Sequence, residues 1–329
     1  MLLNNVVKEK LNAFNQFKFK PGINREVTSY SNEGGFFDCE KVRFYTAFPQ
    51  KIGGWVKHST NQYLGTARAL HNWIALDGSN FMGIGTHLKY YVEESGVFHD
   101  ITPVRKTVTN AITFSASNTS SNITVTNTSH GAVQSDFVTI SGAVSLGGLI
   151  TASVLNQEYQ IASITNNNSF VIVAKDTSGN TVTANASDSG NGGSGVDGVY
   201  QINVGLNTSV GGNGWGAGGW GGINADLTTF GWGESADSGT LAELRLWTHD
   251  NFGEDLLFNP RDGALFYWDK SDGLTSRAVL LSSESGASDV PTIAKQILVS
   301  DIDRHIIAFG ANTLGTAIQD PLLIRFSSQ

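Results

Sequence analysis

Three carboxylates in a short acidic segment are the first candidates for chemistry in this sequence. Asp250, Glu254 and Asp255 lie within residues 248–255 (THDNFGED). Two carboxylates that flank a glycosidic bond can hydrolyse it as acid and base or nucleophile. The same segment is also typical of a polar connection between two strands, and we favour that interpretation because the sequence does not fix the carboxylate separation.

A second segment contains residue types that bind metals. Asp301, Asp303 and His305 alternate along the chain, so a strand would place them on one face. A charged turn that leads into a strand at 306–307 explains the same pattern, and we favour it. The seven histidines form no HxH or HExxH pair, and we find no serine elbow, P-loop or Cys/His pairing. We therefore predict that the chain is not an enzyme and has no metal or cofactor site.

The most unusual segment is rich in glycine and tryptophan, at residues 211–222 (GGNGWGAGGWGG). Its glycines formally match a dinucleotide fingerprint, but more glycine follows where that motif requires a helix. We predict an extended loop in which tryptophan side chains anchor a neighbouring subunit, since tryptophan buries a large area with few torsions to freeze. A purely intrachain role and stacking on carbohydrate are the alternatives. The candidate interface residues are Gly214, Trp215, Gly216, Gly219 and Trp220.

Composition favours short strands and turns over helices. Of 329 residues, 38 are glycine and only 15 % are charged, while 10 % are aromatic. The formal net charge of -8 disfavours wrapping of nucleic acid, which needs clustered Lys and Arg. The only cysteine, Cys39, can form no intramolecular disulfide. No apolar run is long enough for a signal peptide or a membrane span, so we expect synthesis in the cytoplasm.

Two series of short candidate strands flank a region of different composition. Four candidate strands lie between 69 and 101, with a turn at Asp77-Gly78, and a similar series lies between 242 and 269, with a turn at Asp262-Gly263. Residues 304–310 and 321–326 begin a third series, so the chain carries a weak internal repeat. Residues 288–297 carry cap formers before Pro291, which predicts one short helix.

The region between the two series is poor in charge and rich in Ser, Thr, Asn and Gly, yet it also contains alternating runs. One of these runs is residues 159–164 (YQIASI). We predict a mainly β fold: a propeller-like or multi-sheet antiparallel body with an inserted small β-barrel or sandwich. The predicted parts are 1–105 and 200–329 for the body and 106–199 for the insert. Residues 322–329 are typical of a strand in progress, so we expect a fragment or a body that a partner completes.

Several long strings resemble a family of tailed-bacteriophage virion proteins. They are residues 21–26 (PGINRE), 34–44 (GGFFDCEKVRF), 49–55 (PQKIGGW), 246–261 (LWTHDNFGEDLLFNPR), 286–292 (GASDVPT), 301–310 (DIDRHIIAFG) and 320–326 (DPLLIRF). Residues 127–142 of the insert (NTSHGAVQSDFVTISG) resemble small β modules of phage tail proteins, with Ser135 where glycine is common.

The resemblance implies a structural tail component, most plausibly a nozzle or tail-tube protein that forms a ring, commonly sixfold, around a DNA channel. Its implied partners are further copies of the chain, other tail or adaptor proteins and DNA that passes without sequence-specific binding; contact with the host surface is also open. The implied location is the virion tail, and the family supplies no catalytic residues. A receptor-binding or glycan-cleaving tail protein, or a generic adhesin built from β modules, is the alternative.

Overall fold

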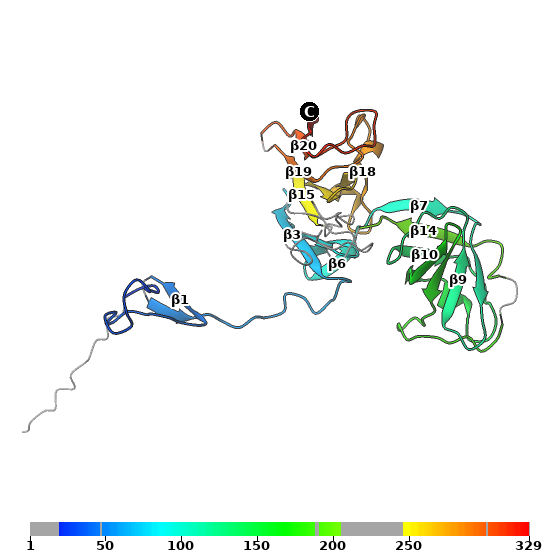
Figure 1. Cartoon of the computed structure of the whole chain (residues 1–329), viewed down its shortest axis with the longest axis horizontal. Helices are drawn as coiled ribbons and strands as arrows, with labels where there is room; N and C mark the ends of the chain where they lie inside the picture. Colours follow the sequence, from blue (N-terminus) through cyan, green and yellow to red (C-terminus); the bar gives the residue numbers. More distant parts are fainter. Residues whose placement is uncertain (1–19, 47, 188–190, 205–245, 301, 329) are drawn as a thin grey trace, which may run out of the picture. The chain divides into compact units, whose positions relative to one another are not determined.

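The computed structural model describes residues 20–46, 48–187, 191–204, 246–300 and 302–328 (Figure 1). The chain divides into two compact units, Met1–His58 and Ser59–Gln329. The described part of the first unit has one hairpin, and that of the second unit has several antiparallel sheets. The prediction of a mainly β fold with several antiparallel sheets is confirmed. The helices in the described part of the chain have only three or four residues, too few to cross a membrane.

The described part of the first unit is built around one hairpin. Strand β1 (Val42–Tyr45) pairs antiparallel with β2 (Phe48–Lys51). A parallel bridge joins Ile23 to Phe36, and the ring of Phe36 meets Phe44 edge-on, with centroids 5.2 Å apart. This aromatic contact attaches the irregular segment before the hairpin to the hairpin itself.

The second unit begins with a four-stranded sheet whose strands follow one another in sequence, here called the first sheet. It comprises β3 (Ala67–Ile74), β4 (Asn80–Thr86), β5 (Tyr90–Glu94) and β6 (Val97–Asp100). Gly78 takes a φ of +86° in the β3–β4 turn, a conformation that glycine adopts without strain. The sequence predicted these four strands and this turn.

Two more sheets of the same simple order lie near the end of the chain. The second sheet comprises β15 (Trp247–Phe252), β16 (Asp255–Pro260), β17 (Phe266–Trp268) and β18 (Val279–Leu280). Two short 3₁₀ turns, η1 (Lys270–Asp272) and η2 (Leu281–Ser283), flank β18. The third sheet comprises β19 (Gln296–Val299), β20 (Ile306–Phe309) and β21 (Ile324–Phe326).

The helix predicted at residues 288–297 is wrong. The segment runs irregularly and then enters β19 at Gln296. The backbone N–H groups of Thr292 and Ile293 donate to the Asn312 side chain at 2.9 and 3.3 Å, and Ala294 forms a bridge with Gly263. These long-range partners satisfy backbone groups that a helix would otherwise satisfy, so tertiary context overrides the local signal.

The three sheets stack on one another through their faces. Strand β15 lies beside β3 on one side and beside β19 on the other, so the first strands of the three sheets are neighbours (Figure 1). One buried cluster joins the first sheet to the second through Trp73, Tyr90 and Phe258, and another joins the second to the third through Leu257 and Ile297. The second sheet is therefore covered on both faces.

An inserted β module, residues 104–201, separates the first sheet from the second along the chain. One of its sheets has the order β11-β10-β14-β7 and the other has the order β12-β13-β9-β8. The strands are β7 (Val104–Val108), β8 (Thr113–Ala116), β9 (Asn122–Thr126), β10 (Phe137–Ser141), β11 (Glu158–Gln160), β12 (Ser163–Asn166), β13 (Ser169–Val173) and β14 (Asp197–Gln201), with helix α1 (Ala152–Leu155) before β11.

The module has its own apolar core. Phe170 and Ile123 from one sheet and Tyr200 and Ile140 from the other belong to a single buried cluster that draws all its members from residues 108–200. The arrangement is a two-sheet sandwich. The compact unit Ser59–Gln329 contains both the module and the stacked sheets, and the predicted domain boundaries at 105 and 199 stay a prediction.

Candidate assembly interface

The predicted interface loop lies outside the described residues. Gly214, Trp215, Gly216, Gly219 and Trp220 fall within 205–245. Their role as subunit anchors stays a prediction.

Of the three carboxylates of the acidic segment, Asp250 lies on β15, Glu254 in the turn between β15 and β16, and Asp255 at the start of β16, and each has a structural partner. Asp250 accepts a hydrogen bond from the backbone N–H of Val299 at 2.8 Å, which ties β15 to β19. Glu254 forms an ion pair with Lys270 at 2.6 Å. Asp255 accepts from the backbone N–H of Lys270 at 3.0 Å and from the Tyr267 hydroxyl. The segment predicted as a connection is therefore mostly strand, with only residues 253–254 between β15 and β16, and its carboxylates hold neighbouring elements together.

The candidate metal ligands are only partly described. Asp301 lies outside the described residues, Asp303 is exposed, and His305 bonds through Nδ1 to the carbonyl oxygen of Ser327 at 2.7 Å. In the described part of the chain, no group of three or more His, Cys, Asp or Glu side chains is arranged to hold a metal ion.

Two histidines that the sequence analysis did not pair lie next to each other between the first and second sheets. The rings of His71 on β3 and His249 on β15 have centroids 4.9 Å apart. His71 Nε2 lies 2.6 Å from Asn251 Oδ1, and the Tyr90 hydroxyl lies 2.9 Å from His249 Nδ1. Burial, and then the neighbouring His71, lower the pKa of His249 to about 4. The pair is thus a hydrogen-bonded element of the sheet contact, and its surroundings disfavour a proton on His249.

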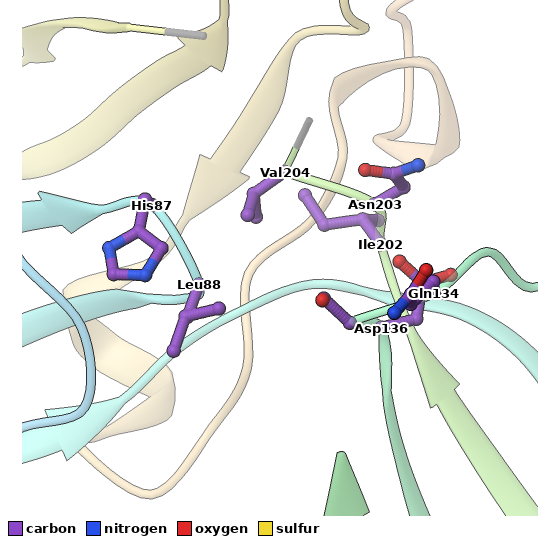
Figure 2. A pocket seen from close by; sticks show the side chains of 8 residues that line it. His87, Leu88, Gln134, Asp136, Ile202, Asn203 and Val204 are labelled. Carbon is purple, nitrogen blue, oxygen red and sulfur yellow. The ribbon is translucent and has the colours of Figure 1, made fainter. Parts of the chain in front are cut away.

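A small pocket lies where three segments of the second unit meet. It is lined by residues 87–88, 134–136 and 202–204, and Figure 2 shows their side chains around it. Its polar groups already serve the backbone, because His87 Nδ1 accepts from the N–H of Thr66 at 2.9 Å and Asp136 accepts from that of Val133 at 3.0 Å. We assign this pocket no chemistry.

The outer face of the third sheet is apolar, and we use this name for Leu298, Ile307, Phe309, Ile324 and Phe326. The strand register places Leu298, Ile307 and Phe326 in one row across the sheet, and Phe309 beside Ile324. Their side chains point away from Ile297 and Ala308, which pack on the second sheet. None of the five is buried, and Ile324 and Phe326 are 56 % and 77 % exposed. A sheet face of this kind marks a surface for association.

The opposite end of the stack also exposes apolar side chains. On β3, Leu70 and Ile74 point away from the second sheet and are 60 % and 69 % exposed. Farther across this face, Tyr63 covers Tyr91 and Phe98, with ring centroids 5.9 and 4.9 Å apart. The outer face of the first sheet, as we use the term, is the part on β3 that contains Leu70 and Ile74.

The sequence signals for these two faces differed. The succession of short candidate strands predicted β3. The helix predicted at residues 288–297 overlaps the start of β19, so the register of the third sheet was not predicted. A strand at 306–309 with four consecutive apolar residues was the available signal, because strands covered on both faces lack alternation.

Comparison with known proteins gives little further guidance. No family model and no curated protein matches the chain. Among solved structures, the chain is similar to "Phage phi92 endosialidase", with a TM-score of 0.23 and 12 % identity, over 85 % of this chain and 40 % of that chain. The chain thus spans well under half of that structure's length.

Proposed function

We propose that this chain is a structural component of a bacteriophage tail, a ring-forming nozzle or tail-tube protein through which DNA passes. The observation that carries the proposal is the stack of three sheets, each with strands in sequence order and with β3, β15 and β19 side by side. On this proposal the three sheets are consecutive propeller blades, and their first strands line an axis. The resemblance of residues 21–55 and 246–326 to tail proteins supports the assignment to a virion.

The charge balance supports a conduit. A net charge of -8 repels the phosphate backbone, so DNA can slide through a ring without being held. On this proposal the partners are further copies of the chain, neighbouring tail or adaptor proteins and the genome in transit, and the protein resides in the virion tail.

Electron microscopy of the intact particle tests the proposal. We expect a ring with an axial hole at the portal-proximal part of the tail, with labelled chain in the ring wall. Label found on peripheral fibres instead, together with release of reducing sugar from host polysaccharide, would contradict it.

The predicted role of the glycine-tryptophan segment has its own test. If Trp215 and Trp220 anchor a neighbouring subunit, the double substitution to alanine weakens assembly more than it lowers the melting temperature. Light scattering reports the assembly mass, and Trp55→Ala is a matched control because Trp55 is fully exposed outside that segment. An unchanged mass in the double variant would remove the anchor role.

A further inference from the structure

The outer face of the third sheet carries the apolar side chains that are typical of a sheet face buried against another sheet. The second sheet shows what coverage on both sides requires: Leu256, Leu257 and Phe258 are consecutive on β16, all completely buried, with Leu257 facing the third sheet and its two neighbours facing the first. Strand β20 repeats this pattern, with Ile307 and Phe309 on one side and Ala308 on the other. Among the described residues, the buried contacts cover the Ala308 side. The apolar row on the other side therefore calls for a partner.

The contacts within the chain define the kind of partner that fits. Each existing contact places an apolar sheet face on another sheet face, and aliphatic and aromatic side chains interdigitate between them. An antiparallel sheet with an exposed aliphatic patch would continue this stack. The chain carries such a patch at its other end, on the outer face of the first sheet, where Leu70 and Ile74 are exposed.

We propose that the outer face of the third sheet binds the outer face of the first sheet of a second copy of this chain, head to tail. Two unlike faces joined in this way make a heterologous contact, the type that closes into rings. Besides the hairpin and the two sheets of the inserted module, the described part of one chain supplies three stacked sheets, and two copies supply six of these, within the range of about four to eight blades in a propeller. The inference rests on the proposed ring function and names the surfaces that join the copies.

The first experiment is light scattering of the full chain with charged substitutions on each face. Wild-type protein is expected at twice the 35.1 kDa mass of the chain or more. Ile324→Glu with Phe326→Glu, and separately Leu70→Glu with Ile74→Glu, should each give monomers. Ile302→Glu is the matched control, because Ile302 is 90 % exposed outside both faces, and it should keep the wild-type mass. Circular dichroism shows whether each variant folds, and single substitutions replace any double variant that does not.

A mixing experiment separates head-to-tail pairing from pairing of like faces. A variant substituted on the outer face of the third sheet keeps an intact outer face on its first sheet, and the other variant keeps an intact face on its third sheet. An equimolar mixture of the two variants should therefore form a one-to-one dimer. Pairing of like faces would instead let one of the two variants dimerise by itself through its intact face. That result, or monomers in the mixture, would overturn the proposal. Wild-type protein that stays monomeric would overturn it as well, but the ring in the particle would still be judged separately by microscopy.

Discussion

The ring of Tyr90 lies almost parallel to the ring of Phe258, with centroids 4.1 Å apart and planes inclined by 15°. Tyr90 belongs to the first sheet and Phe258 to the second, and both side chains are completely buried. The inserted module separates these strands in the sequence. This stack is therefore the central contact that joins the two parts of the sheet body.

Loss of the Phe258 ring should destabilise the second unit strongly. Phe258→Ala removes a buried ring and leaves a cavity against Tyr90, which costs about 3–5 kcal/mol of unfolding free energy. Phe48→Ala, on a ring that is 70 % exposed in the first unit, should cost far less. Urea unfolding followed by tryptophan fluorescence measures both changes, and equal losses would contradict the central role of the stack.

Stability should fall in mild acid because of His249. The unfolded chain binds a proton at this residue below pH of about 6.5, whereas the folded pKa is about 4. The contribution of neutral His249 to the free energy of unfolding is thus complete above pH 6.5. It is lost as the pH falls from 6.5 towards 4, by about 3 kcal/mol in total.

A substitution isolates this effect from other titrations. His249→Gln should flatten the loss of unfolding free energy between pH 6.5 and 4, and His58→Gln, at an exposed position, should leave its slope unchanged. The measurement is urea unfolding at a series of pH values. The same slope in wild type and His249→Gln would show that the histidine pair does not set the acid response.

Much of the fold was predictable because its signals are local. The short strands at 67–100 follow one another and are separated by turn residues such as Gly78, so strand spacing and turn chemistry agree. The run at 159–164, however, was predicted as one strand and is divided between two sheets. Ile161 donates its N–H to Asp136 and Ala162 donates to Val171, and no local pattern reveals this crossing.

The candidate interface was harder to predict because it depends on register. Leu298 and Phe326 share a face only because Ile307 lies between them in the sheet. The side chain of Asn312, about twenty residues downstream, keeps the start of this region from being helical. Contacts of this kind are decided by tertiary packing.

A buried ion pair joins the inserted module to the first sheet, and its strength can be measured. Lys89 Nζ lies 2.6 Å from Glu158 and 2.7 Å from Asp100, and its side chain is only 2 % exposed. A double-mutant cycle with Lys89→Met and Glu158→Gln should give a coupling of about 1–3 kcal/mol, since burial limits screening by water.

A second ion pair in the chain has the same N–O distance but is exposed, so it serves as the control. Arg25 and Asp38 also lie 2.6 Å apart, with side chains 63 % and 66 % exposed. The cycle of Arg25→Met and Asp38→Asn should give at most about 1 kcal/mol. Equal couplings in the two cycles would contradict the view that burial strengthens the Lys89 pair.

Ser135 lies in a backbone conformation that suits glycine better, and it therefore offers a stabilising substitution. Its φ is +76°, in the left-handed region where a Cβ is strained and glycine is not. Ser135→Gly should therefore raise the unfolding free energy by about 0.5–1 kcal/mol, the relief of strain less the added entropy of the unfolded chain. Ser163→Gly, on the exposed strand β12, should lower it instead, because glycine weakens an extended strand. Urea unfolding measures the change in unfolding free energy of each variant, and we expect a gain for Ser135→Gly and a loss for Ser163→Gly. A loss in both variants would contradict the role of the backbone conformation at Ser135.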